Sequence, residues 1–344
     1  MNIAIISFTL TGGLLNKRLI VELKRSNYLV TGYTIDKYYK ELGLNTIGES
    51  LNKWVEECFK KFEGIIFIGA CGIAVRSIAP FLKGKDKDPA VVVINEIGKY
   101  IIPILSGHIG GANDLAIDIA SMINGIPVIT TATDLNNKFA VDIFAKKKNL
   151  FIENIKMIKH ISSKILIGEK VSLVSDFEVN NLPSELKISQ EGDVGIVIST
   201  KLVKPFIYTL NLIPKINYVG IGCRKGKSLE EIEEVVFNIL KEENISINSI
   251  KNICSIDLKK FEDGIIDFSQ KYKIPFHTYS ANELKCLEGE FTKSEFVSSV
   301  TGVNNVCERA AALGSNNGKL IVKKISKDGI TVAIAQEEWS VDFE

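Results

Sequence analysis

The chain has 344 residues, of which 46% are hydrophobic and 24% are charged, a composition typical of a soluble globular protein. Its 42 basic and 41 acidic side chains leave a formal charge of +1, without the basic excess that nucleic-acid binding proteins show. The length predicts two or three domains, because a single hydrophobic core rarely grows beyond about 250–300 residues.

The cysteines and the apolar segments indicate the compartment and exclude several classes of site. Six cysteines are scattered without a C-x-x-C pair or a histidine at ligand spacing, which predicts reduced thiols and no metal site. The opening residues lack the basic leader of a secretory signal. The charge-free apolar segment 64–75 is shorter than the roughly 20 residues of a membrane helix. We therefore expect a cytoplasmic protein with no membrane or nucleic-acid partner.

Short β-branched runs alternate with helical patterns in the first part of the chain. The predicted elements are a strand at 2–7, a helix ending at Arg25, a helix at 51–62, a buried strand at 64–70, a hairpin of 90–96 and 99–106, a helix at 112–123 and a strand at 126–131. This alternation predicts an α/β domain over 1–140, built on a largely parallel sheet.

The pattern changes after this domain and then returns. Residues 141–214 alternate apolar and polar side chains with little helical periodicity, which predicts a small β-rich middle domain. From 215 to 344 strands and helices alternate again, and two helices open on the Ser-x-x-Glu capping-box spacing, at 228–231 and 280–283. The fold class is therefore α/β and multi-domain, with three-layer α/β domains at both ends.

The segment GACGIAVRSIAP, residues 69–80, follows a buried strand of the first domain. Gly69 and Gly72 fall where α/β folds bind ligands, and Arg76 lies about one helical turn further on, able to pair with a carboxylate. The alternative is a glycine turn with a surface arginine, and the residues alone do not decide between the two.

The segment IPILSGHIGGAND, residues 102–114, places a histidine at a predicted strand-to-helix junction. Free N–H groups at such a helix start stabilise developing negative charge, and His108 has an unperturbed pKa near 6.5, suited to proton transfer. Glu96 ends a buried strand and is a candidate base or an orienter of His108. In the alternative, Asn113 or Asp114 caps the helix while His108 packs. The other predicted members of this site are Ser106, Gly107, Gly110, Gly111 and Asn113.

Three further segments carry candidate binding residues. TTATD, residues 130–134, places hydroxyls and a carboxylate just past a strand end, where an ST-turn is the alternative. VGIGCRKGKS, residues 219–228, sets a cysteine beside two cations, which either depress its thiol pKa or, in the favoured interpretation, anchor substrate carboxylates. Two more strand-to-helix junctions follow in the last domain. The predicted substrate-binding residues here are Thr131, Thr133, Asp134, Gly222, Cys223, Arg224, Lys225, Asp257, Lys259, Thr301 and Gly302.

Taken together, these segments resemble a known family. GACGIAVRSIAPFLKGKDKDPAVVVINEIGKYIIPILSGHIGGANDLA and PVITTATD look like the N-terminal domain of the cobalt-precorrin-5A hydrolases of anaerobic cobalamin biosynthesis. VGIGCRKG, SIDLK, TGVNNVCERAA and ITVAIA resemble the C-terminal domain of that family, which is similar to the separate CobE protein. The resemblance covers 64–134 and 217–335.

The resemblance implies a reaction and its partners. Family members open the δ-lactone of cobalt-precorrin-5A and release acetaldehyde to give cobalt-precorrin-5B, a hydrolysis that also cleaves a carbon–carbon bond. Cobalt enters as part of the substrate, so we expect no cofactor and no metal site in the protein. Contact with neighbouring cobalamin-pathway enzymes is expected to be transient, and a homodimer stays open.

A mechanism follows as a hypothesis from the residue chemistry. His108 acts as the base for water, and the N–H groups of Gly110 and Gly111 receive the oxyanion. Arg76 and Arg224 hold substrate carboxylates, and the macrocycle lies between the N- and C-terminal domains. Two alternatives stay open, a non-catalytic carrier of a tetrapyrrole intermediate and a nucleotide-binding α/β enzyme, although the glycine spacing does not match a dinucleotide fingerprint.

Overall fold

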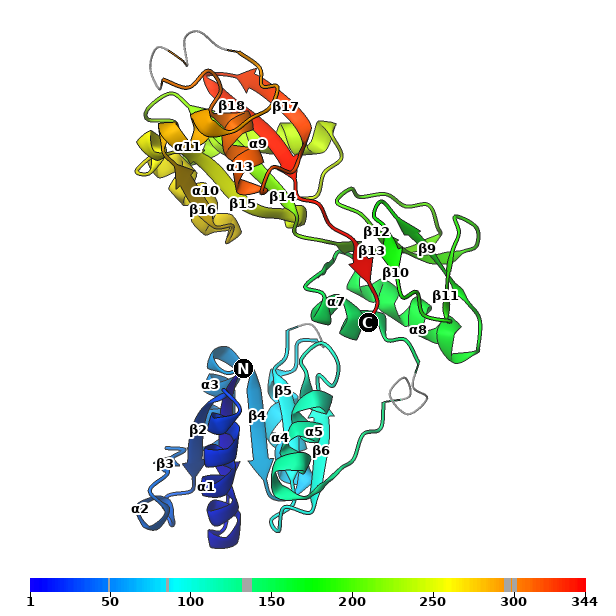
Figure 1. Cartoon of the computed structure of the whole chain (residues 1–344). Helices are drawn as coiled ribbons and strands as arrows, with labels where there is room; N and C mark the ends of the chain where they lie inside the picture. Colours follow the sequence, from blue (N-terminus) through cyan, green and yellow to red (C-terminus); the bar gives the residue numbers. More distant parts are fainter. Residues whose placement is uncertain (49, 85–86, 132–137, 294–297, 299–301) are drawn as a thin grey trace. The chain divides into compact units, whose positions relative to one another are not determined.

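The computed structural model describes all of the chain except residues 49, 85–86, 132–137, 294–297 and 299–301 (Figure 1). It divides into two compact units, Met1–Ile143 and Phe144–Glu344. Each unit contains helices packed on multi-strand sheets, which confirms the mixed α/β class. The predicted boundary at 214 falls inside the second unit and stays a prediction.

The first unit is built on one sheet whose strands follow the order β3-β2-β1-β4-β5-β6-β7. The strands are β1 (Asn2–Ser7), β2 (Leu29–Thr34), β3 (Asn45–Thr46), β4 (Gly64–Ile68), β5 (Ala90–Ile94), β6 (Tyr100–Leu105) and β7 (Ile126–Pro127). Neighbours from β3 to β5 run parallel, as expected for βα units. The last strand is shorter than the predicted 126–131.

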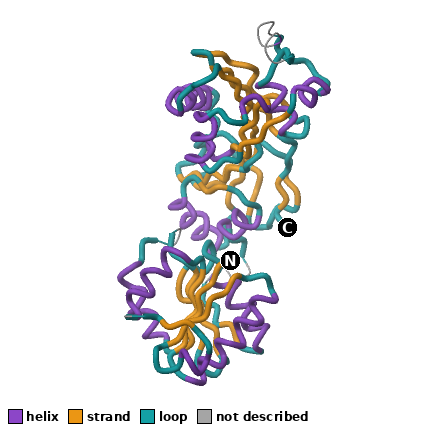
Figure 2. The backbone as a smooth tube through the Cα atoms, turned by 90° about the vertical axis from the view of Figure 1, so that its left-hand side faces the viewer, coloured by secondary structure: helices purple, strands orange, loops and turns teal. Residues whose placement is uncertain are grey.

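Helices cover both faces of this sheet, as Figure 2 shows. Apolar residues of α1 and α5 pack on one face, and those of α3 and α4 pack on the other. Because helices cover both faces of β1 and β4, the side chains on both faces of these strands are apolar, and the sequence there is a continuous apolar run. The helical segments of this unit are α1 (Leu10–Arg25), α2 (Tyr39–Leu42), α3 (Leu51–Lys61), α4 (Cys71–Ile78), η1 (Ala79–Phe81) and α5 (Ala112–Ile123), and helix α7 (Val141–Lys147) crosses the boundary between the two units.

The direction of the chain reverses between β5 and β6. Their antiparallel register pairs Ile94 with Ile101 and Val91 with Leu105, which confirms the predicted hairpin. Because β5 runs parallel to β4, the end of β6 lies at the opposite edge of the sheet from the ends of β4 and β5. A residue following β6 is therefore separated from a residue following β5 by about the length of the hairpin, on the order of 15 Å.

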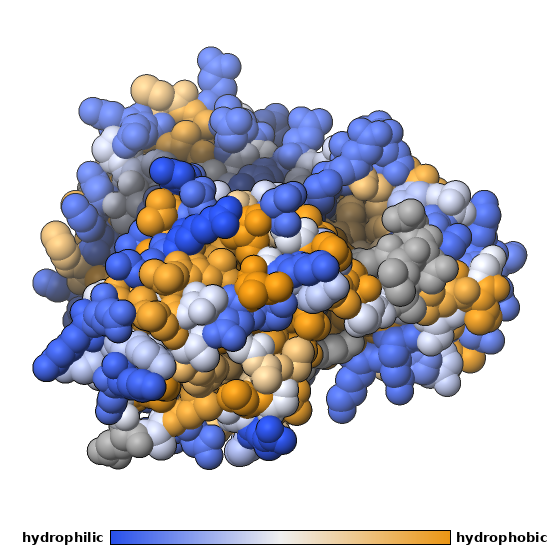
Figure 3. Space-filling view, turned by 90° about the horizontal axis from the view of Figure 1, so that it is seen from below, coloured by the Kyte–Doolittle hydropathy of each residue, from blue (hydrophilic) through white to orange (hydrophobic). Residues whose placement is uncertain are grey.

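The edge at which β1, β4 and β5 end is partly apolar. Leu10, Val75 and Ile97 follow these strands and are 38%, 46% and 73% exposed. Figure 3 views the molecule from below, the side toward which these strands run in Figure 1, and apolar side chains gather in the middle of that view among charged ones.

The second unit begins with a sheet in the order β11-β9-β12-β13-β8, parallel except for the edge strand β8. Helix α8 packs on it through Ile158, Ile161 and Ile165, so this region holds more helix than the β-rich pattern predicted. The elements are β8 (Phe151–Ile152), η2 (Ile155–Met157), α8 (Ile158–Leu166), β9 (Val171–Ser175), β10 (Val179–Asn180), β11 (Leu186–Ile188), β12 (Val194–Ile198) and β13 (Tyr208–Ile213).

A second sheet in this unit has the order β16-β15-β14-β18-β17, with α9 and α10 on one face and α13 on the other. Both predicted capping boxes are present, at Ser228 and Ser280. The elements are β14 (Asn217–Cys223), α9 (Leu229–Glu242), η3 (Ile247–Ser249), β15 (Ile250–Ile256), η4 (Asp257–Lys259), α10 (Asp263–Tyr272), β16 (Phe276–Tyr279), α11 (Ala281–Cys286), α13 (Cys307–Gly314), β17 (Lys319–Lys327), β18 (Ile330–Gln336) and β19 (Val341–Asp342).

A glycine sets the distance between α13 and the strand beneath it. A Cβ atom at Gly220 of β14 would lie 1.8 Å from the carbonyl oxygen of Cys307, at the start of the helix. The carbonyl oxygen belongs to the backbone and cannot rotate away, so helix α13 would have to move. The missing side chain at Gly220 therefore fixes where the N-terminus of α13 meets the end of β14.

We expect Gly220→Ala to lower the free energy of unfolding of the second unit by about 3 kcal/mol or more, since overpacked cores lose typically 1–3 kcal/mol even where side chains can adjust. Urea denaturation measures the loss. Gly222→Ala on the same strand is the control, because its new Cβ would meet only the rotatable Thr331 hydroxyl, at 2.7 Å. Equal midpoints for the two variants would contradict this account of the packing.

Candidate functional site

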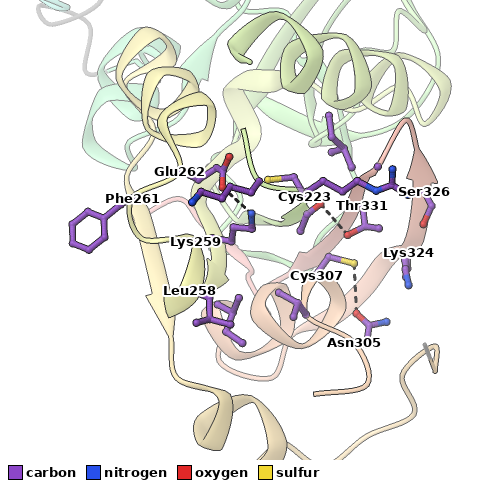
Figure 4. Close-up of a pocket in the computed structure, with 17 residues that line it drawn as sticks. Cys223, Leu258, Lys259, Phe261, Glu262, Asn305, Cys307, Lys324, Ser326 and Thr331 are labelled. Atoms are coloured by element: carbon purple, nitrogen blue, oxygen red, sulfur yellow. Dashed lines mark hydrogen bonds and ion pairs between the residues drawn. The ribbon is translucent and has the colours of Figure 1, made fainter. Parts of the chain in front are cut away.

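A cavity of about 900 Å³ opens where β14 and β15 of the second unit end (Figure 4). This edge is the place where α/β sheets bind ligands, and the volume is at the large end of ordinary ligand sites. The walls come from the 222–225 loop, the 256–262 segment, the start of α13 and the β17–β18 hairpin. The lining residues are Gly222, Cys223, Arg224, Lys225, Ile256, Leu258, Lys259, Phe261, Glu262, Asn305, Val306, Cys307, Lys324, Ser326, Gly329, Ile330 and Thr331.

A buried asparagine shapes the wall at the start of α13. Asn305 is fully buried, and its Oδ1 accepts a hydrogen bond from the Glu308 N–H at 2.9 Å, as a helix cap does. Its Nδ2 donates to the carbonyl of Thr292 at 2.9 Å. The buried Glu308 carboxylate accepts from the backbone N–H groups of Thr292 and Lys324, both at 2.7 Å. These bonds tie α13 to the β17 strand and hold the cavity wall in place.

The charge around the cavity is strongly positive. Within the described residues, Arg224, Lys225 and Lys324 make no salt bridge, whereas Lys259 pairs with Glu262 at 2.7 Å. The apolar part of the lining includes Ile256, Leu258, Val306 and Ile330. Free cations beside an apolar floor suit a large ligand that carries several carboxylates.

Glu262 anchors the lysine that reaches into this cavity. Its Oε1 accepts a hydrogen bond from the Gly226 N–H at 2.5 Å while Oε2 receives Lys259. Burial alone would raise the pKa of Glu262, but the bonds from Lys259 and Gly226 outweigh it and hold the pKa below its usual value. Lys259 is thus paired with a carboxylate, whereas Arg224, Lys225 and Lys324 make no salt bridge within the described residues.

The thiol of Cys223 departs from the sequence prediction. Burial raises the pKa of this thiol, and the opposing effect of Lys259 does not offset it. The neighbouring Arg224 and Lys225 side chains are exposed, so water screens their charge. The predicted depression of the thiol pKa is therefore wrong, and Cys223 is a neutral wall of the cavity.

Most of the candidate binding residues of the second unit meet in this cavity. Gly222, Cys223, Arg224, Lys225 and Lys259 all line it. Asp257 is exposed outside the lining. Gly302 lies against Lys285, since its Cβ would be 3.3 Å from that Nζ. Thr301 falls outside the described residues.

Sequence reasoning missed several lining residues. Lys324 lies on a strand that reads as alternating apolar and basic, with no motif to mark it. Leu258 and Phe261 are 66% and 84% exposed, and in Figure 4 the Phe261 ring points away from the other labelled side chains. Only their place directly after β15 signals that they border a ligand site.

The histidine of the first unit makes a close contact that the sequence did not suggest. His108 Nδ1 lies 3.1 Å from Oδ2 of Asp142, and the two side chains are 13% and 9% exposed. Asp142 is in the first turn of α7, 34 residues further along the chain. The structure thus assembles a histidine–carboxylate pair at the edge where β6 ends.

The glycines around His108 serve a tight turn. A Cβ at Gly107 would lie 2.8 Å from Asn113 Oδ1, and one at Gly110 would lie 2.4 Å from Ser106 Cβ. Ser106 takes a left-handed backbone with φ of 57° and donates its hydroxyl to the Asp88 carbonyl at 2.9 Å. The Gly111 N–H bonds to the carbonyl of His108 at 3.0 Å. Of the two predicted oxyanion donors, Gly111 is therefore engaged in the turn.

A second candidate from another segment joins this loop. Asn113 Nδ2 donates to the Thr131 hydroxyl at 3.0 Å, which places Thr131 beside the glycine-rich loop, and its role in binding stays a prediction. Thr133 and Asp134, the other candidates of that segment, lie outside the described residues. Asn113 does not cap α5 with its side chain, since the N-cap position is Gly111, in a left-handed conformation.

Glu96 does not orient His108. It follows β5 and accepts a hydrogen bond from the Thr9 hydroxyl, at the edge of the sheet opposite the end of β6. Gly69, Gly72 and Arg76 follow β4 and share the edge of Glu96. The hairpin reverses the chain between β5 and β6, so these residues and His108 lie at opposite edges of the sheet, and the predicted pairing of Glu96 with His108 is wrong.

Within the described part of the chain, no three histidine, cysteine or acidic side chains gather as metal ligands would. Among those same residues, no helix combines the length and apolarity needed to cross a membrane.

Family models match the chain in three consecutive segments. They are described as cobalamin synthesis G N-terminal over 53–134, cobalamin biosynthesis central region over 139–214, and cobalamin synthesis G C-terminus over 217–335. The last segment contains the whole cavity, and the first contains the His108 loop.

Curated relatives match most of the chain. A protein of Priestia megaterium named cobalt-precorrin-5A hydrolase is 31% identical over 88% of this chain and 87% of its own length. A protein of Salmonella typhimurium with the same name is 32% identical over 97% of both chains. Protein CobE of a Sinorhizobium species is 28% identical over 34% of this chain and 77% of its own length.

Thiol labelling tests the environment of Cys223. We expect iodoacetamide at pH 7.5 to modify the exposed Cys286 well before Cys223, because burial and a raised pKa leave little Cys223 thiolate. Peptide mass spectrometry over a time course separates the two sites. In urea the two cysteines should react at similar rates. If Cys223 were labelled faster than Cys286 in the native protein, its thiol pKa would be lowered and this account of its environment would be wrong.

Proposed function

The chain belongs to the cobalamin synthesis G family, and on that premise we propose that it hydrolyses cobalt-precorrin-5A. The proposed reaction opens the δ-lactone of the ring-contracted macrocycle and releases acetaldehyde, giving cobalt-precorrin-5B. Cobalt is part of the substrate in this reaction. The curated names of relatives over nearly the whole chain support the assignment to a hydrolase.

The observation that carries the proposal is the cavity of the second unit. A tetrapyrrole precursor presents a broad apolar ring and many carboxylates. The cavity presents an apolar floor with Arg224, Lys225 and Lys324 unpaired around it, within the described residues. A guanidinium pairs with a carboxylate through two parallel hydrogen bonds, so Arg224 is the strongest single anchor.

The hydrolytic step needs a base and a donor to the oxyanion. In the proposed step His108 takes a proton from water, and the hydroxide adds to the lactone carbonyl. Collapse of the intermediate breaks the ring C–O bond, and the released oxygen takes the proton back. The Gly110 N–H, which has no hydrogen-bond partner among the described residues, is the remaining candidate donor. When the hydroxyl formed from the lactone oxygen gives up its proton again, its oxygen forms the carbonyl of acetaldehyde, and the carbon–carbon bond breaks with the electron pair left on the macrocycle.

A carrier of tetrapyrrole intermediates is the second candidate, because the cavity accounts for binding without His108. The two functions differ in product. The proposed enzyme converts its ligand and releases acetaldehyde, whereas a carrier binds the coloured macrocycle unchanged.

Anaerobic incubation with cobalt-precorrin-5A tests the proposal. We expect the chain to release one acetaldehyde per macrocycle, and His108→Gln to lower kcat by roughly 10²- to 10⁴-fold, the usual contribution of a general base. His160→Gln is the control, because His160 stacks on Tyr208 in the second unit and has no part in the mechanism. Binding without acetaldehyde from the unmodified chain would favour the carrier, and full activity of His108→Gln would remove the base assignment.

The anchoring role of the cavity has its own test. We expect Arg224→Gln to raise KM by roughly 10- to 100-fold with little change in kcat, because a charge-assisted hydrogen bond contributes about 1.5–3 kcal/mol. Arg18→Gln, at an exposed position of α1, should leave KM unchanged. An unaltered KM in Arg224→Gln would place carboxylate recognition elsewhere.

A further inference from the structure

The contact between His108 and Asp142 has the geometry of an orienting pair. One carboxylate oxygen of Asp142 lies 3.1 Å from Nδ1 of His108, within hydrogen-bond distance. Both side chains are largely withdrawn from water, at 13% and 9% exposure, where a hydrogen bond to a charged group is stronger than at the surface. The pair is therefore more than a surface contact between two mobile side chains.

The carboxylate is itself fixed and ionised. Its other oxygen, Oδ1, accepts a hydrogen bond from the Ile143 N–H at 3.1 Å, in the first turn of α7, where the helix favours negative charge. Burial would raise the pKa of Asp142, but the contact with His108 and the backbone N–H bonds of residues 142 and 143 together outweigh it and hold the pKa below its usual value. Asp142 thus meets His108 as an anion, which accepts a proton and does not donate one.

The loop presents the ring on a rigid backbone. The turn closes through the carbonyls of Ser106 and Gly107, which accept from the N–H groups of Ala112 and Asn113 at 3.1 and 3.0 Å. A Cβ at Gly110 would lie 2.8 Å from the backbone carbonyl oxygen of Ser106, so there is no room for one. The backbone that carries the ring is therefore held in place, and the contact with Asp142 orients the Nδ1 side of the ring.

We propose that Asp142 is a positioning residue for His108: it holds the proton of the neutral ring on Nδ1 and leaves Nε2 as the basic nitrogen. The catalytic use of that nitrogen rests on the proposed function, but the tautomer does not. A free neutral imidazole prefers the proton on Nε2, so the pair reverses the intrinsic preference. His108 alone was singled out from the sequence, and Asp142 supplies the part of the site that Glu96 was expected to supply.

Nitrogen NMR of the full chain labelled with ¹⁵N-histidine tests the tautomer directly. The chain has three histidines, so the His108 signals are identified as those lost in His108→Gln. Above the titration range of the ring, we expect unmodified protein to show protonated Nδ1 and bare Nε2. Asp142→Ala should move the proton to Nε2. An Nε2-protonated ring in the unmodified chain would overturn the inference without any variant being needed.

The kinetic constants of Asp142 variants provide a second test of the positioning role. Asp142→Ala and Asp142→Asn should lower the kcat of acetaldehyde release by tenfold or more while KM stays within about twofold, because only the chemical step loses its base. Asp118→Asn, which alters an exposed carboxylate bonded to Tyr28, should leave both constants unchanged. If both Asp142 variants keep full kcat, the positioning role fails. If no form of the protein releases acetaldehyde, the proposed function fails, and the NMR result still decides the tautomer.

Discussion

The cavity of the second unit depends on a backbone contact that only glycine permits. With no side chain at Gly220, the start of α13 rests directly on β14, and the capping bonds of Asn305 then fix the helix against the adjoining segments. The end of the strand and the start of the helix become two walls of one hollow. The cations that line it come from elements separated by about a hundred residues, Arg224 after β14 and Lys324 on β17. Their convergence follows from the topology of the sheet.

The elements around this cavity were predictable because their signals are local. Capping boxes, alternation and glycine-bearing strand ends mark β14, α9 and the 222–225 loop without reference to the rest of the fold. Lys324 could not be found in this way. Its role arises from pairing between β17 and β18, and no local pattern distinguishes it from the lysines beside it. The raised pKa of Cys223 was also out of reach, since burial depends on the packed neighbours.

In the first unit the hairpin of β5 and β6 was predicted correctly, but Glu96 and His108 were wrongly expected to lie close together. That expectation assumed that all strands of the sheet end at the same edge. The register of β5 and β6 separates the two residues, because a hairpin turns the second strand back toward the start of the first. Asp142 was not among the predicted site residues, because it is far from His108 in the sequence. It lies in the predicted middle domain, 141–214, and only the folded chain brings its carboxylate within 3.1 Å of the His108 ring.

The hydrogen bond between Thr9 and Glu96 affects which ligands can bind at the edge of the first sheet where β1, β4 and β5 end. Thr9 caps α1 through the Gly12 N–H, and the Glu96 carboxylate sits at this helix start, receiving the Thr9 hydroxyl. In nucleotide-binding α/β proteins the corresponding helix end attracts a phosphate. Here a carboxylate of the chain itself lies beside the helix start, where it accepts a hydrogen bond from the capping hydroxyl of Thr9. A diphosphate at this helix end would meet like-charge repulsion from Glu96.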